Sequence, residues 1–486
     1  MSLNKVLRPG LRARNVVIFA LLISTTLVLL SSRRVSTFVL LESLGSNTET
    51  LSSILSSTPP PSHSSSLPIP LPSGYQNAPG QEGYCEQRYT TRYLETLREG
   101  EVSYCSPGSP SQLTCFHTPS DFHDDGHIDS FCIAQGSAFN AATNRFELGC
   151  SLRPDAEVPL SKLHPYWYRT GPWYLFHSHF SIAGPESPAW HPDAEASAKR
   201  TFSILVKREG PGNIFHVFHE IMSMTYTMDV LQMSRDPQTG KPRFSQEDIA
   251  NTQVVIMDSF EDGGFIELWR LMSDRPIKRL SELVAEDPEW LTNNGNTIIL
   301  PLAGGSNPVW HQTPEDHNCI NQLREVFSKR VLDFYQIPQD ESMVPTQGEP
   351  APRPLTLTFI NRTATRQLNN ADGLLDEIRS RFRLEDVHVQ SVNFARLPLR
   401  DQIQVARATD ILVGVHGAGL MHALFMAARR GAVVEIFPAT LDFNALRAIA
   451  LERGLAYYST HDTTREYVRP WQEESLDVDE GCLGGW

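Results

Sequence analysis

A glycine-rich turn in the last third of the chain has the residue types and spacing needed to bind an anion. Residues 411–415 form an apolar, β-branched run typical of a buried parallel strand, and His416 follows directly. Gly417 and Gly419 allow a tight turn, and residues 420–426 predict a helix whose free N–H groups can face a phosphate. His416 would then lie at the carboxyl end of the strand, where open α/β sheets bind ligands. A turn that binds nothing explains the glycines alone equally well.

Two arginines after another predicted strand supply positive charge for the same anion. Residues 355–360 are strand-like, Asn361 and Arg362 follow at the strand end, and Arg366 lies four residues further on. Guanidinium groups form forked, charge-assisted hydrogen bonds with pyrophosphate oxygens. Glu435, in a further apolar strand, is placed to accept hydrogen bonds from ribose hydroxyls, although an acid at a strand end is more often simply solvated.

Residues 213–220 could remove a proton from a substrate hydroxyl. If a helix begins near Asn213, His216 and Glu220 lie four residues apart on one face. An imidazole and a carboxylate so placed can orient each other and act as a general base, and the sequence does not decide which takes the proton. His219 lies on a different face, where a histidine beside aromatic residues is more often a hydrogen-bonded core residue.

A metal site is not favoured. The order of His216, His219 and Glu220 departs from the zinc-protease pattern, which has histidines four apart with the glutamate after the first. Acidic residues and histidines between 121 and 129 are better explained as a solvated loop, because no apolar segment frames them. The one Asp-x-Asp pair, at 477–479, lies in an acidic tail with no strand before it.

The N-terminus predicts a membrane anchor. Residues 16–32 contain an apolar run with more Lys and Arg before it than after it, which predicts a cytoplasmic tail at 1–15 and a lumenal remainder, the type II orientation. A cleaved signal peptide is the alternative. Residues 33–80, rich in Ser, Thr and Pro, predict a flexible stem.

Composition limits the function of the rest. About 400 residues remain, enough for two domains, and the net charge of −14 disfavours nucleic-acid binding. Seven cysteines without a Cys-x-x-Cys pair favour disulfides in an oxidising compartment. The odd number leaves at least one thiol free or paired between chains, and spacing does not give the connectivity.

These motifs together resemble glycosyltransferase family 61, a eukaryotic group that includes secretory-pathway protein O-GlcNAc transferases and plant xylosyltransferases. The resemblance extends over roughly residues 210–458, about half of the chain. The segments that carry it are Asn213 to His216 (NIFH), Asn361-Arg362 with Arg366 and Asn369, Gly414 to Leu420 (GVHGAGL), and Glu435 to Pro438 (EIFP).

The resemblance implies an α/β, GT-B-like architecture of two facing Rossmann-like domains. We expect an acceptor-side domain at 81–337 that begins with a disulfide-rich part, a linker at 338–354, a nucleotide-sugar-binding domain at 355–470 and an acidic tail at 471–486. The resemblance also implies a UDP-sugar donor, inversion at the sugar, and no obligatory metal or other cofactor.

The hypothesis is therefore a glycosyltransferase of the Golgi or endoplasmic reticulum membrane that transfers GlcNAc or xylose to a protein or glycan. A catalytically inactive lumenal carbohydrate-binding or scaffold protein with the same fold is the alternative. His216 and Glu220 are the expected catalytic residues, with Asn213 and His219 contacting or supporting the acceptor. The expected donor-binding residues are Asn361, Arg362, Arg366, His416, Gly417, Ala418, Gly419 and Glu435.

Overall fold

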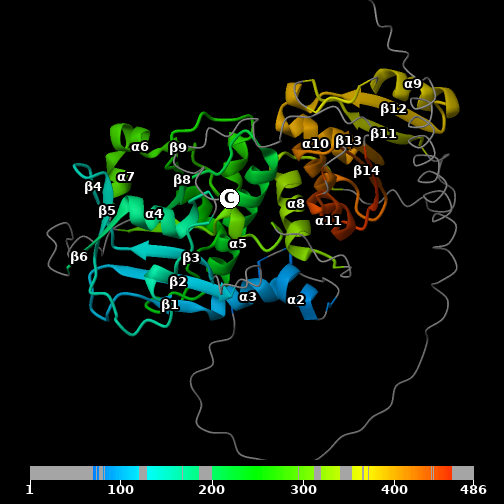
Figure 1. Cartoon of the computed structure of the whole chain (residues 1–486). Helices are drawn as coiled ribbons and strands as arrows, with labels where there is room; N and C mark the ends of the chain where they lie inside the picture. Colours follow the sequence, from blue (N-terminus) through cyan, green and yellow to red (C-terminus); the bar gives the residue numbers. More distant parts are fainter. Residues whose placement is uncertain are drawn as a thin grey trace, which may run out of the picture.

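The protein is an α/β structure with three sheets, seen here in a computed structural model (Figure 1). The described residues are 69, 71–72, 74–75, 80–81, 83–119, 128–166, 168–184, 200–293, 295–310, 319–339, 353–363, 366–369, 371–438, 441 and 443–461. The predicted cytoplasmic tail, membrane anchor and acidic tail, and most of the predicted stem and linker, lie outside them. Among the described helices, none is both long and apolar enough to cross a bilayer.

The largest sheet has seven strands in the order β1-β2-β3-β10-β7-β8-β9. Its first three strands run antiparallel, whereas β10, β7, β8 and β9 run parallel. The strands are β1 (Glu101–Ser103), β2 (Gln112–Pro119), β3 (Ile128–Gln135), β7 (Thr201–Val206), β8 (Thr252–Ile256), β9 (Lys278–Arg279) and β10 (Asn296–Leu300).

Helices and a small sheet cover this sheet. The three-stranded sheet consists of β4 (Ala138–Asn140), β5 (Arg145–Gly149) and β6 (Phe180–Ala183). The α-helices here are α2 (Gly83–Tyr89), α3 (Thr91–Glu99), α4 (Gly171–His179), α5 (Ile214–Met233), α6 (Leu280–Glu286), α7 (Pro288–Thr292) and α8 (Gln322–Phe334). Short 3₁₀ helices lie at η1 (Leu160–Lys162), η3 (Gln246–Asn251), η4 (Ile266–Met272) and η5 (Gly304–Ser306).

The C-terminal sheet has five parallel strands in the order β12-β11-β13-β14-β15. The chain leaves β11 for β12 on one side and continues from β13 on the other, so the topological switch point lies between β11 and β13. The strands predicted at 355–360 and 411–415 are confirmed as β11 and β13. The elements are β11 (Leu355–Ile360), α9 (Ala371–Arg381), β12 (Val387–Val392), η6 (Phe394–Arg396), α10 (Leu399–Arg407), β13 (Ile411–Val415), η7 (Ala418–Phe425), β14 (Ala432–Phe437), α11 (Ala445–Glu452) and β15 (Ala456–His461).

Helices α5 and α8 join the two larger sheets into one core (Figure 1). Helix α5 is buried on nearly every side, as expected for a largely apolar helix at the centre of a domain. Helix α8 contacts η7, and the Ser328 hydroxyl donates to the Leu424 carbonyl at 2.9 Å. Arg324 of α8 forms a buried ion pair with Glu452 of α11, and its guanidinium also donates to the Val309 carbonyl at 3.0 Å.

Three disulfides stabilise the N-terminal half, as cysteine usage predicted. They join Cys85 to Cys319, Cys105 to Cys150 and Cys115 to Cys132. Cys482 lies outside the described residues.

The folded part begins before the predicted end of the stem at residue 80. Tyr75 is 3 % exposed and belongs to the main core. Its hydroxyl donates to Asp229 of α5 at 2.7 Å, and Arg330 of α8 holds the same carboxylate in a fork. Nothing in the sequence indicated that Tyr75 is buried, because it lies in a Ser/Pro-rich segment and its partners, Asp229 and Arg330, lie far along the chain.

The Arg324–Glu452 ion pair predicts a stability difference. Glu452→Ala leaves the Arg324 charge buried without its counter-ion, so we expect a loss of about 3–5 kcal/mol in the free energy of unfolding. Glu385→Ala is the matched control, because its pair with Arg383 is exposed and we expect a change of about 0–1 kcal/mol. Chemical denaturation measures both; equal losses would contradict a stabilising role for the buried pair.

Candidate active site

Two arginines converge on one backbone turn at the switch point of the C-terminal sheet. Arg362 follows β11 and His416 follows β13. The guanidinium of Arg366 donates to the His416 carbonyl at 2.9 Å, and that of Arg362 lies 3.5 Å from the same oxygen. The prediction that Arg362, Arg366 and the 416–419 turn lie together agrees with this geometry. Asn361 ends the strand, and its N–H donates to the Val392 carbonyl at 2.9 Å.

Gly417 is required by that turn. Its φ of +152° lies in a region that side-chain-bearing residues rarely adopt. A Cβ at Gly417 would collide with the Arg362 guanidinium and lie 3.2 Å from Nη1 of Arg366. Arg366 itself has a φ of 50°, a left-handed conformation that is uncommon for arginine and typical of functional sites. The glycine therefore allows both positive charges to approach the backbone.

The segment after the turn differs from the prediction. Ala418 and Gly419 begin the 3₁₀ helix η7, whereas the sequence predicted an α-helix over 420–426. The first bond runs from the Leu420 N–H to the Gly417 carbonyl at 3.0 Å. Gly414 and Gly419 lie against Leu420 and Ile360, so close packing of the turn onto the sheet replaces a regular helix start.

Glu435 is held by two side chains of the protein. It has no exposed surface, and its two carboxylate oxygens lie 2.5 Å from Nδ1 of His416 and 2.6 Å from the hydroxyl of Tyr457. The expectation of a direct contact with ribose therefore needs correction: Glu435 orients the His416 ring, which also stacks on Phe437. The sequence predicted that Glu435 lies near the strand end. It could not show that each carboxylate oxygen already has a partner within the protein.

The second cluster lies at the start of α5, beside the carboxyl ends of β7 and β10. His216 is close to Glu209, with 3.6 Å between Nδ1 and Oε2. The sequence predicted that His216 and Glu220 orient each other, but Oε1 of Glu220 instead accepts from the Glu209 N–H at 2.7 Å. Asn213 caps α5 by accepting from the Phe215 N–H at 3.0 Å, which is a supporting role.

Glu209 is the site residue that the sequence prediction missed. It lies three residues after β7, the position at which parallel strands present ligand-binding groups, and that signal could have identified it. Its Oε1 accepts from the Thr170 hydroxyl at 2.9 Å and from the Gly305 N–H at 3.2 Å. A Cβ at Gly304 would lie 2.8 Å from Glu220 and 2.9 Å from Glu209. The glycine thus lets both carboxyl groups fit beside the backbone.

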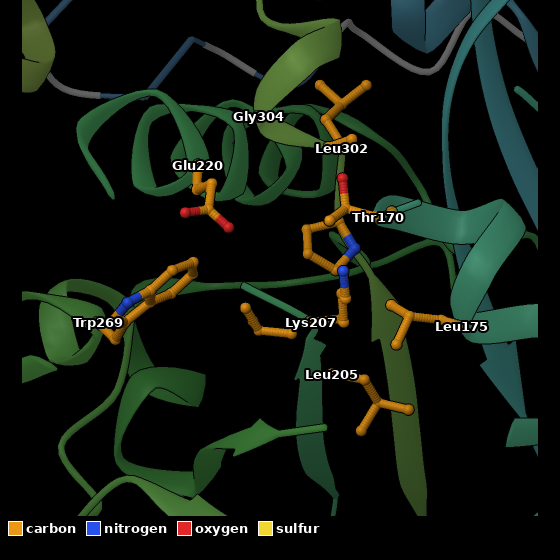
Figure 2. A pocket seen from close by; sticks show the side chains of 12 residues that line it. Thr170, Leu175, Leu205, Lys207, Glu220, Trp269, Leu302 and Gly304 are labelled. Carbon is orange, nitrogen blue, oxygen red and sulfur yellow. The ribbon is translucent and has the colours of Figure 1, made fainter. Parts of the chain in front are cut away.

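Burial raises the pKa of Glu220 well above its ordinary value, and the nearby Glu209 raises it further. The Glu220 carboxyl points into a small pocket between α5, the end of β7 and residues 301–304 (Figure 2). Lys207 and Trp269 also line this pocket.

His219 is a structural residue. It has no exposed surface, and its ring nitrogens lie 2.7 Å from the Phe215 carbonyl and 3.3 Å from the Val309 carbonyl. Burial, with the Arg324 charge nearby, lowers the pKa of His219 to about 3. A neutral imidazole held by two backbone carbonyls supports α5, in agreement with the hydrogen-bonded core histidine that its sequence context indicated.

No group of three or more potential metal ligands is found in the described part of the chain. Of the acidic and histidine-rich segment between 121 and 129, only residues 128 and 129 are described, and Asp129 is buried with the Tyr166 hydroxyl donating to it at 2.7 Å.

Comparison with known proteins identifies the part of the chain that holds both clusters. Residues 214–433 match the family model described as Glycosyltransferase 61. This region belongs to glycosyltransferase family 61. It contains His216, Glu220, the two arginines and the 416–419 turn, whereas Glu209 precedes it. The resemblance predicted from the motifs is confirmed.

Two similar proteins are named as N-acetylglucosamine transferases. The chain is 27 % identical over 277 residues to an EGF domain-specific O-linked N-acetylglucosamine transferase of Drosophila melanogaster, covering 56 % of this chain and 47 % of the relative. It is 25 % identical over 301 residues to a protein O-linked-mannose beta-1,4-N-acetylglucosaminyltransferase 2 of Tetraodon nigroviridis, covering 56 % and 45 %. The chain spans about half the length of the curated relatives it matches.

The raised pKa of Glu220 predicts how stability depends on pH. The folded protein keeps this proton at pH values where the unfolded chain has released it, so the contribution of Glu220 to stability falls as pH rises above about 4.5. Glu220→Gln removes this titration. We expect the stability of the variant relative to the parent to increase with pH, by at most about 1.4 kcal/mol per pH unit. Denaturation series at several pH values measure it, and a flat or falling difference would contradict the assignment.

Proposed function

We propose that the chain is an inverting, metal-independent glycosyltransferase that uses a UDP-sugar. The observation that carries the proposal is the convergence of Arg362 and Arg366 on the Gly417 turn at a topological switch point. Two guanidinium groups supply the charge and the forked donors that a diphosphate needs. The fold is then of the GT-B type, with domains at 81–337 and 355–470 that each present the carboxyl ends of parallel strands.

The proposed reaction transfers the sugar in one displacement. His216 takes the proton of the acceptor hydroxyl through Nε2, because its Nδ1 faces Glu209. The hydroxyl oxygen bonds to the anomeric carbon as the bond from that carbon to the diphosphate oxygen breaks, so the configuration inverts. Arg362 and Arg366 stabilise the negative charge that develops on the leaving diphosphate. The 3.6 Å separation of His216 and Glu209 can shorten when substrates bind.

GlcNAc is the sugar that we propose first. The two relatives above are named as N-acetylglucosamine transferases, one acting on EGF domains and one on O-linked mannose. Xylose remains a second candidate from the family resemblance, and the acceptor is a protein or glycan. The three disulfides and the apolar segment at 16–32 support a place in the Golgi or endoplasmic reticulum, with a single-pass type II anchor.

The donor site predicts metal-independent UDP binding. Arg362→Ala removes one of the two charges near the diphosphate, so we expect UDP affinity to fall at least tenfold, by about 1.4 kcal/mol or more. Calorimetric titration with and without EDTA measures it. Arg379→Ala, which removes an exposed arginine of α9, is the control and should leave UDP affinity unchanged. Loss of UDP binding in EDTA would overturn the metal-free site.

The base assignment predicts a separate loss of turnover. His216→Gln removes the proton acceptor but none of the diphosphate contacts, so we expect turnover to fall about 10²–10⁴-fold with UDP affinity retained. Glu209→Gln should lower turnover less, because the imidazole remains. Sugar-transfer rates and UDP titrations on the same preparations separate the two effects. Full turnover by the His216 variant would exclude it as the base, and UDP binding without transfer or donor hydrolysis in the parent would favour a non-catalytic binding protein.

A further inference from the structure

Three aromatic rings surround the His216 imidazole. The centroids of Tyr168, Trp310 and Phe215 lie 4.9, 5.1 and 6.0 Å from that of His216, each at a steep angle to it. Trp310 also packs 5.1 Å from Phe215 and 6.5 Å from Tyr168. All three side chains are only partly buried, so the proposed base lies within an aromatic wall that retains exposed surface.

Polar atoms that lack partners lie beside this wall. Oε2 of Glu209 and Oε2 of Glu220 are buried and have no hydrogen-bond partner among the described residues, and the Glu209 oxygen lies 3.6 Å from Nδ1 of His216. The side chain of Glu209 is completely buried. Buried polar atoms are nearly always hydrogen-bonded in native proteins, so these oxygens point to a ligand or water that forms hydrogen bonds with them. An aromatic surface next to unpaired acceptors matches a sugar ring, which has an apolar face and hydroxyl groups at its edge.

The backbone around Tyr168 is held in place by contacts outside the family 61 region. The Lys207 ammonium donates to the Tyr168 carbonyl at 2.7 Å, and the Thr170 hydroxyl donates to Glu209 at 2.9 Å. Tyr166 and Arg169, on either side, have φ values of 50° and 49°. Left-handed residues that persist within a constrained segment are typical of binding sites.

We propose that Tyr168 and Trp310 form a platform that binds a sugar ring of the acceptor beside His216, so that the acceptor is a glycan and not a bare serine or threonine. This inference rests on the proposed glycosyltransferase function. The platform would hold the ring by its apolar face and turn one hydroxyl toward His216, while Glu209 and Glu220 form hydrogen bonds with hydroxyl groups at its edge. A serine side chain has no ring to contact the platform.

The test uses the full chain with the UDP-sugar that supports turnover and two kinds of acceptor: methyl glycosides, including methyl mannoside, and a peptide rich in serine and threonine. We expect transfer to a glycoside at a rate well above transfer to the peptide. Trp310→Ala should raise the KM for the glycoside at least tenfold while the affinity for UDP, which the proposal assigns to Arg362 and Arg366, is retained. Trp310→Phe, which keeps a ring, should recover most of the lost affinity.

Trp173→Ala is the matched control. Trp173 also packs against a histidine ring, that of His177 at 4.8 Å, and its removal should leave the KM for the glycoside unchanged. Preferred transfer to the peptide, or an unchanged glycoside KM in Trp310→Ala, overturns the platform. An absence of UDP binding and of donor hydrolysis in the parent instead overturns the proposed function, so the two failures are distinguishable. If Trp310→Ala does not fold, competition of glycosides against the peptide in the parent decides the same point.

Discussion

The packing of α5 against η7 is the constraint on which the rest of the structure depends. Helix α5 carries His216 near its start, and η7 follows directly from the Gly417 turn. Phe218 of α5 lies 5.5 Å from Phe425 of η7 and 6.4 Å from His422. Because α8 also bonds to η7, the two sheets share one core and are not free to hinge about a polar interface. The proposed base and the proposed diphosphate site are thus fixed with respect to each other.

Both clusters place buried carboxylates behind a histidine. Glu435 fixes the ring of His416, and Glu209 faces that of His216. A buried carboxylate is costly unless hydrogen bonds satisfy it, and the protein meets this requirement differently at the two sites. Glu435 is saturated by His416 and Tyr457, whereas Glu209 and Glu220 retain unpaired oxygens beside the pocket. Glu435 therefore orients the His416 ring, whereas Glu209 and Glu220 are suited to forming hydrogen bonds with a substrate.

Sequence patterns predicted the features that depend on local order. Strands β11, β13 and β14 of the C-terminal sheet, the arginines after β11 and the glycine turn after β13 followed from apolar runs and glycine spacing. Contacts between residues far apart in the sequence were either not predicted or predicted wrongly. Glu209 meets His216 only because β7 ends beside the start of α5, and no spacing within residues 213–220 could show that Glu220 faces the backbone of Glu209. Close packing of Leu420 onto Gly414 likewise produces a 3₁₀ helix where apolar composition predicted an α-helix.

The stereochemistry of donor hydrolysis tests the central claim most directly, since it needs no knowledge of the acceptor. The protein would be incubated in EDTA with UDP-GlcNAc, whose sugar is α-linked, and the first GlcNAc released would be observed by proton NMR before it mutarotates. Single-displacement attack without a metal predicts the β-anomer. Release of the α-anomer, or hydrolysis that EDTA abolishes and a divalent cation restores, would contradict the account.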